Sequence, residues 1–148
     1  MRILRSIPKT TILFLFIGLS SIAQQKQDIV GYWKSCDEDD NMVVRVQLDA
    51  KGIPVGHLVG FQRDDGTWEE NKPKKGIKVM YNFKYDGALK WNKGKIYDPI
   101  AKRTYSGVIK LQSKDIIKAV GYWLFLWDDI LYKRISLDKE NELKKLID

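Results

Sequence analysis

Apolar and polar residues alternate with a period of two in segment after segment of this chain, and this pattern constrains the fold most. Polar residues separate Val44, Val46 and Leu48, for example. A period of two is typical of strands with one buried and one solvated face. No long segment before the C-terminus shows the 3.6-residue period of a helix. We therefore predict eight strands, at about 30–36, 42–49, 53–62, 77–85, 88–97, 103–112, 115–123 and 127–135.

The predicted connections are short, with one exception. Asp49 to Gly52 and the pair Asp86-Gly87 are typical hairpin turns, and Asp98-Pro99 opens another turn. The exception is the lysine-rich segment 63–76, which is long for a connection between neighbouring strands. Long loops often serve as lids or binding elements, so we expect 63–76 to be the most mobile internal segment.

The predicted fold is all-β, an eight-stranded antiparallel up-and-down barrel. Locally joined antiparallel strands must protect their edges, and closure into a barrel removes the edges outright. A barrel of eight strands holds either its own side chains or one small ligand. A β-sandwich is the alternative, but it needs longer crossing connections than this chain has.

The two ends of the chain have their own patterns. Arg2, Arg5 and Lys9 precede an apolar run, and Ser21 and Ala23 supply the small residues that signal peptidase requires. This pattern predicts a secretory signal at 1–23, cleaved after Ala23, and a protein that is periplasmic or secreted. An uncleaved anchor is the alternative, although the apolar run is about half of the roughly 20 residues that span a bilayer.

With the leader removed, the barrel domain is predicted at 24–136. Residues 137–148 are predicted to form a short polar C-terminal helix or tail.

The composition excludes several classes of function. The formal charge of +7 falls to +4 without the leader, which holds three basic residues and no acidic ones. This mildly basic surface does not predict nucleic-acid binding. Cys36 and His57 are the single residues of their kinds, so neither a disulfide framework nor a Cys/His zinc site is available. The acidic run 37–40 lacks the spacing of a calcium loop and is interpreted as a solvated turn. No nucleophile or phosphate-binding motif is present, and we predict no enzyme activity, no cofactor and no metal.

Four motifs carry a resemblance to a known family. They are Gly31-Tyr32-Trp33, the block Gly94 to Pro99 (Gly-Lys-Ile-Tyr-Asp-Pro) followed by Thr104-Tyr105, Gly121-Tyr122, and Leu131 to Ile135. Together they resemble the bacterial exported family called domain of unknown function 2147, over nearly the whole chain after the leader. The resemblance implies an eight-stranded lipocalin-like barrel, a secretory leader and no established activity. It implies a structural role for the family turn motif, whose members here are Gly94, Tyr97, Asp98 and Pro99. Lys102 stands where the family usually has a glycine with left-handed backbone.

Aromatic residues on the central strands are the candidate ligand-binding residues. Trp and Tyr combine a large apolar area with one polar group, which suits a pocket for an amphipathic small molecule. The alternative is that these rings simply fill the barrel. The candidates, which we expect to point inward, are Tyr81, Phe83, Trp91, Tyr97 and Tyr105.

Two functions remain open at this stage. The first is the binding of a small apolar or amphipathic molecule inside the barrel. The second is an interaction module of the cell envelope that uses the loop 63–76 on an acidic partner or on anionic lipid headgroups. The sequence does not predict the oligomeric state.

Trp33 and Arg134 are predicted to meet where the barrel closes. The first and last strands of a closed barrel pair, so residues near their ends become neighbours. Lipocalins resemble this chain in having a Gly-x-Trp on the first strand and an Arg near the end of the last. We expect the Arg134 guanidinium to lie on the face of the Trp33 ring. The alternative is a Trp33 packed on aliphatic neighbours, with Arg134 in solvent.

Overall fold

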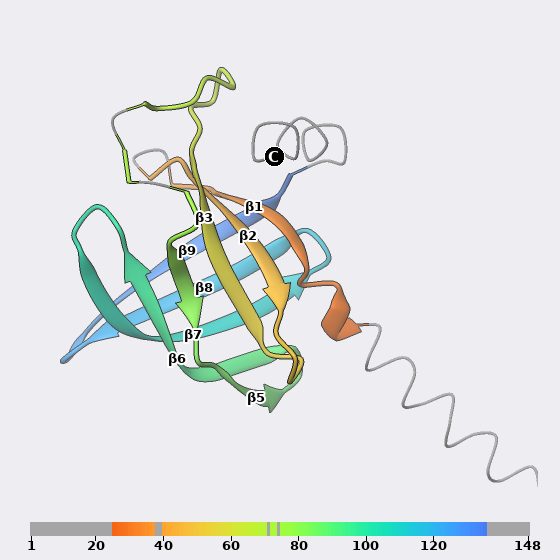
Figure 1. Ribbon diagram of the computed structural model, residues 1–148. Helices are drawn as coiled ribbons and strands as arrows, with labels where there is room; N and C mark the ends of the chain where they lie inside the picture. Colours follow the sequence, from red (N-terminus) through yellow and green to blue (C-terminus); the bar gives the residue numbers. More distant parts are fainter. Residues whose placement is uncertain (1–24, 38–39, 71, 74, 136–148) are drawn as a thin grey trace, which may run out of the picture.

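Nine strands make up the fold (Figure 1). The computed structural model describes residues 25–37, 40–70, 72–73 and 75–135. A single helical turn at 25–27 precedes the first strand. The strands are β1 (Gly31–Ser35), β2 (Met42–Leu48), β3 (Pro54–Phe61), β4 (Lys78–Tyr81), β5 (Lys84–Gly87), β6 (Lys90–Asp98), β7 (Arg103–Ser113), β8 (Ile116–Trp123) and β9 (Leu126–Arg134).

Eight of these strands form a closed antiparallel barrel, as the alternation predicts. The strand order is β4-β3-β2-β1-β9-β8-β7-β6-β5, and an additional pairing of β4 with β6 closes the ring. Strand β5 is the extra one and pairs with β6 alone. The first and last strands pair with Trp33 opposite Arg134. The all-β barrel prediction is confirmed.

The prediction of one continuous strand at 77–85 is wrong. The structure has two short strands there, β4 and β5, with a break between them. The chain leaves the sheet after β4 because Asn82 has a left-handed backbone, with φ of 59°. Phe83 then turns inward into space that exists only because Gly94 has no side chain, since a Cβ there would overlap the Phe83 ring. The hairpin that follows turns at Ala88 and Leu89, both with positive φ, and not at the predicted Asp86-Gly87.

Large side chains fill much of the barrel interior. The largest fully buried ones are Trp33, Trp91, Tyr132 and Phe61. The Trp91 ring lies 5.4 Å from the Tyr85 ring, centroid to centroid. Burial of these apolar surfaces is the main stabilising term of such a fold, at about 25 cal/mol per Å².

The long connection between β3 and β4 folds back on the end of β3. Trp68 pairs with Gln62 in an isolated bridge, and a Cβ on Gly60 would lie 3.0 Å from the Trp68 ring. Within the loop, the Arg63 backbone N–H donates to the Thr67 carbonyl at 2.9 Å. These contacts give the described part of 63–76 a defined conformation.

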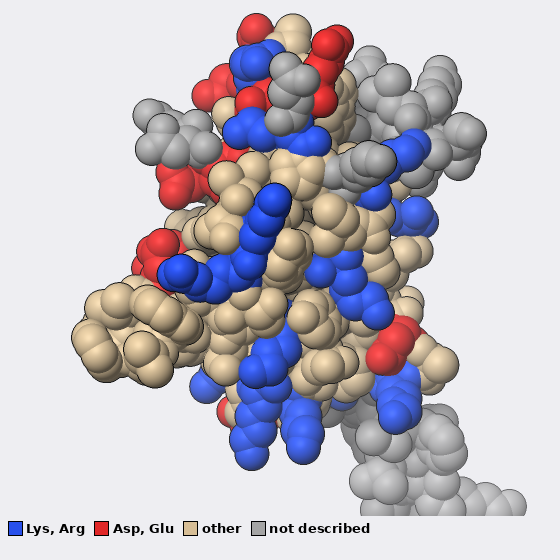
Figure 2. Space-filling view, turned by 60° about the vertical axis from the view of Figure 1, so that its left-hand side comes forward, with Lys and Arg blue, Asp and Glu red and all other residues tan. Residues whose placement is uncertain are grey.

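Charged side chains cover much of the outer surface. In Figure 2, Lys and Arg are spread over the visible face and acidic side chains gather near its top, while one lobe at the left carries no charge. The predicted leader 1–23 and the predicted C-terminal helix 137–148 lie outside the described residues. In the part of the chain that is described, no helix has the length and apolarity needed to cross a membrane.

Candidate ligand-binding site

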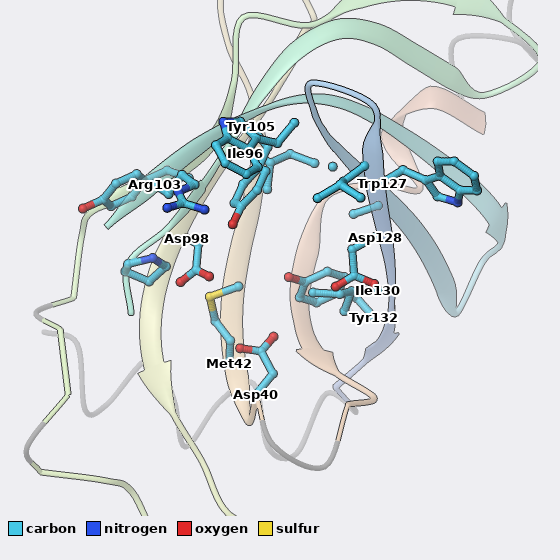
Figure 3. Close-up of a pocket in the computed structure, with 16 residues that line it drawn as sticks. Asp40, Met42, Ile96, Asp98, Arg103, Tyr105, Trp127, Asp128, Ile130 and Tyr132 are labelled. Atoms are coloured by element: carbon cyan, nitrogen blue, oxygen red, sulfur yellow. The ribbon is translucent and has the colours of Figure 1, made fainter. Parts of the chain in front are cut away.

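A cavity of about 320 Å³ lies at one end of the barrel, bounded mainly by β6, β7, β8 and β9 (Figure 3). This volume is at the lower end of the range for small-molecule sites, about 300–1,000 Å³. The strand register brings the lining side chains together, because Ile96 pairs with Tyr105 and Ala119 pairs with Ile130.

Most of the cavity wall is apolar. Among its lining residues, Met42 and Ala119 are buried, whereas Trp123, Leu126 and Trp127, near the β8–β9 turn, are exposed. The apolar and aromatic lining residues are Met42, Ile96, Tyr97, Pro99, Tyr105, Ala119, Trp123, Leu126, Trp127, Ile130 and Tyr132. Such a wall accepts a hydrocarbon chain or ring.

Charged groups line the remainder of the cavity. Three of them are carboxylates, from Asp40, Asp98 and Asp128, and one is the guanidinium of Arg103. In Figure 3 the Tyr132 hydroxyl points toward the side of the cavity where Asp40 and Asp98 lie. Acidic groups therefore outnumber basic ones.

Asp40 has a partly buried carboxyl group. Its Oδ2 atom is buried and, among the described residues, has no hydrogen-bond partner. Burial raises the pKa of Asp40 above its ordinary value, a hydrogen bond with Ser35 opposes this rise, and the charges of Asp98 and Asp37 add to it. The interpretation of 37–40 as a solvated turn is therefore wrong for Asp40, because its side chain is partly buried and its Oδ2 atom is shielded from solvent.

Tyr132 remains a neutral phenol. Its ring is fully buried, and this burial raises the pKa of Tyr132 well above its ordinary value, with further contributions from Asp40 and Asp98. A phenol that keeps its proton can act as a hydrogen-bond donor in the cavity.

Asp98 lines the cavity and also stabilises the turn between β6 and β7. Its Oδ1 atom accepts hydrogen bonds from the backbone N–H groups of Ile100 (2.8 Å) and Ala101 (2.9 Å). The same turn contains Lys102, whose φ of 53° is left-handed. Lys102 thus adopts a backbone conformation that glycine normally occupies.

Of the five aromatic candidates, two line the cavity and three do not. Tyr97 and Tyr105 line the cavity. Phe83 and Trp91 are buried in the core at 4% and 0% exposure and do not line it. Tyr81 is partly buried and also lies away from the cavity lining.

Sequence reasoning missed several lining residues. Asp40 stood in an acidic run, and Trp123 and Trp127 stood next to a predicted turn. Tyr132 and Ile130 follow the period of two in the last strand, so that signal could have placed them inside the barrel.

His57 and Cys36 lie away from the cavity lining. Partial burial lowers the pKa of His57, and the positive charges of Lys78 and Arg45 lower it further. The Cys36 thiol is free and exposed. In the described ranges, no three His, Cys, Asp or Glu side chains gather into a group that could hold a metal ion.

A family model described as an uncharacterized protein conserved in bacteria, DUF2147, matches residues 31–134. The chain belongs to the DUF2147 family. The matched residues run from the first strand to the last, so the DUF2147 region is the barrel itself.

One solved structure shows the same fold as this DUF2147 chain. It is protein HP1028 from the human pathogen Helicobacter pylori, which is described as belonging to the lipocalin family. The TM-score is 0.62 at 17% sequence identity, over 78% of this chain and 88% of that chain. Comparison with curated proteins gives no match.

Proposed function

We propose that this protein is an exported, non-enzymatic binding protein that holds a small amphipathic molecule in the barrel cavity. The observation that carries the proposal is the cavity of about 320 Å³, which combines an apolar wall with acidic groups and a neutral phenol. The lipocalin-like barrel supports it, since eight-stranded barrels have room for one small ligand.

The charges favour a ligand with a positively charged head. A cation entering the cavity meets the carboxylates of Asp40, Asp98 and Asp128. The single lining guanidinium, Arg103, is already stacked on the Trp123 ring at 4.5 Å. A protonated amine satisfies the unpartnered oxygen of Asp40 and removes part of the cost of burying that acid. The preferred ligand class is therefore a short-chain or compact apolar amine.

Three probes of equal chain length test this proposal. Octylamine, octanol and octanoate each have eight carbons and differ in the charge of the head. In isothermal titration calorimetry at pH 7 we expect octylamine to bind at least about tenfold more tightly than octanoate, with octanol between them; tenfold corresponds to about 1.4 kcal/mol. Failure of all three probes to bind, or a preference for octanoate, argues against the proposed chemistry.

A matched pair of variants locates the site. Gly121 lines the cavity, and a Cβ there would lie at ordinary contact distance from Tyr105, so Gly121→Leu adds a side chain to the cavity wall. The neighbouring Val120→Leu adds one methylene where the strand faces outward. We expect Gly121→Leu to abolish octylamine binding and Val120→Leu to preserve it. Equal binding by the two variants would place the ligand elsewhere.

The lysine-rich loop gains less support as a binding surface. The segment 63–76 carries as many acidic residues as basic ones, with Asp64, Asp65, Glu69 and Glu70 against Arg63, Lys72, Lys74 and Lys75. Lys72 lies 3.7 Å from the Glu69 carboxylate and 5.4 Å from the Phe61 ring centroid. A loop of balanced charge is a weak attractor for anionic lipid.

A further inference from the structure

Six consecutive large apolar residues are exposed at the β8–β9 turn. Figure 1 shows this hairpin extending beyond the rest of the barrel, and Figure 2 shows an uncharged lobe projecting at the same height. The exposed fractions are Tyr122 43%, Trp123 42%, Leu124 80%, Phe125 82%, Leu126 54% and Trp127 70%. Large contiguous apolar surfaces are unusual on soluble proteins and mark interaction sites.

The turn itself is built against local preference. Leu124 has φ of 56°, a left-handed conformation that costs a branched side chain free energy, and hairpin turns with positive φ at the first central residue favour glycine there. Leu89 has a similar φ, but its side chain packs on the core. Leu124 receives no such compensation, because four-fifths of it is exposed. The apolar tip therefore serves something other than the fold.

The polarity of the hairpin changes steadily with distance from the turn. Leu124 and Phe125, at the tip, have no polar side-chain atoms, and Trp123 pairs with Leu126 behind them. The next pair is formed by Tyr122 and Trp127, each with one polar group.

Along the hairpin itself, charged residues begin only behind these pairs, while Arg103 of β7 stacks on the Trp123 ring from outside the hairpin. Asp128 comes first, and Asp129 forms an ion pair with Lys118 at 2.6 Å. At about 3.3 Å per residue, the uncharged part is about 10 Å long.

This order matches the depth profile of a lipid bilayer. Leu and Phe partition into hydrocarbon, Trp and Tyr gather at the headgroup level, and charges stay in water. Interfacial elements bury their apolar parts to a depth of about 5–10 Å. Beyond Tyr122, strand β8 has no partner other than β9 in the described sheet. Its outward backbone groups need water or headgroups, so the fit is to the interfacial layer and not to the hydrocarbon centre.

We propose that the hairpin tip, residues 122–127, inserts into the interfacial layer of a lipid bilayer and docks the barrel there. The groups at its base carry no excess of basic charge, since Lys118 is paired with Asp129, and Asp98 and Asp128 stand against the single guanidinium of Arg103. Attachment is therefore apolar and needs no anionic lipid.

Docking would place the cavity beside the membrane. Trp123, Leu126 and Trp127 belong both to the tip and to the cavity lining. An amphipathic molecule dissolved in the bilayer then reaches the cavity without crossing bulk water. The docking proposal goes beyond ligand binding and holds whether or not octylamine binds.

Vesicle co-sedimentation tests the docking. The protein is purified after export and its N-terminus is sequenced, so that every variant has the same first residue. We expect it to bind phosphatidylcholine vesicles, and to bind vesicles of equal parts phosphatidylcholine and phosphatidylglycerol with similar affinity at low and high salt. No binding to phosphatidylcholine, or binding only to the anionic vesicles at low salt, overturns the proposal.

Variants separate insertion from misfolding. Leu124→Gly with Phe125→Ser places glycine at the turn residue that has positive φ, so the fold is retained while the apolar tip is lost. We expect this variant to lose at least about tenfold in vesicle affinity, because two large apolar side chains no longer leave water. Leu131→Asn, which removes an exposed leucine from the same strand, should bind as the parent does. Parent-like binding by the tip variant overturns the proposal.

A second copy of this chain is the competing occupant of the tip. Light scattering after size-exclusion chromatography distinguishes it. A dimer that the tip variant converts to a monomer, together with no vesicle binding by the parent, would overturn membrane docking in favour of self-association. Octylamine titrations of the same samples report on the cavity independently.

Discussion

The guanidinium of Arg134 lies 4.2 Å from the centroid of the Trp33 ring, at the seam between the first and last strands. Its Nη1 donates to the Val30 carbonyl at 2.8 Å, its Nε donates to the Lys114 carbonyl at 2.7 Å, and its Nη2 donates to the Asp28 carbonyl. The predicted contact is present. It ties the N-terminal turn to the end of the barrel.

Gly31 makes room for this contact. Its φ of 146° suits glycine, and a Cβ there would lie 2.5 Å from Nη1 of Arg134. The Trp33 indole N–H donates to the Ile29 carbonyl at 2.9 Å, so the edge of the ring is also fixed. The Gly31-Tyr32-Trp33 motif thus has a structural explanation.

Trp33→Ala should destabilise the protein more than Arg134→Lys. Removing the ring leaves a cavity and costs about 3–5 kcal/mol, whereas the stacking itself contributes about 0.5–2 kcal/mol. Free energies of unfolding from urea denaturation measure both effects. A double-mutant cycle with Trp33→Phe and Arg134→Lys should show coupling, and strictly additive losses would mean that the contact contributes nothing to stability.

Lys102→Gly should stabilise the β6–β7 turn. Lysine pays a steric cost at φ of 53° that glycine avoids, although glycine loses more chain entropy on folding. We expect a net gain of about 0.5–1 kcal/mol in thermal or urea unfolding. Lys102→Ala keeps the Cβ and serves as the control. If the alanine variant gains as much, removal of the lysine charge is the cause and the backbone is not.

The exported protein should begin at Gln24. The basic, apolar and small-residue regions of 1–23 predict cleavage after Ala23. Intact mass and N-terminal sequencing of protein recovered after export measure the cleavage position. Ala23→Arg places a large charged residue at the cleavage site and should block processing. An exported product that still carries Met1 would contradict the prediction.

The period of two predicted the barrel and most of its strands because side-chain direction in a strand is a local property. It could not predict the break at Asn82, since the space that Phe83 fills depends on Gly94 in a different strand. The same limit applies to the cavity. Trp91 and Tyr105 are both on inward-facing positions, but alternation tells which face a side chain occupies and not how far along the barrel it lies.

Asp40 was missed for a related reason. A run of acids near a strand start is normally solvated, and only the packed barrel end shows that one oxygen of Asp40 is buried without a partner in the described structure. Burial raises its pKa in the fold, so the folded state binds a proton more readily than the unfolded state does. Ionised Asp40 therefore opposes folding, and this opposition is absent below the unfolded value near 3.8.

Asp40→Asn should therefore make the protein more stable relative to the parent as the pH rises from about 4 toward neutrality. The parent loses stability over the window between 3.8 and the raised pKa of Asp40, because its unfolded state releases a proton there that its folded state still holds, and the asparagine variant has no such proton. Asp65→Asn is the control of opposite sign. Hydrogen bonds from Thr67 lower the pKa of Asp65, so the Asp65 carboxylate favours folding above pH 3.8. Its loss in Asp65→Asn should lower the free energy of unfolding at neutral pH. Urea midpoints across this pH range measure both variants. Parallel profiles for Asp40→Asn and the parent would mean that Asp40 is solvated in the folded protein.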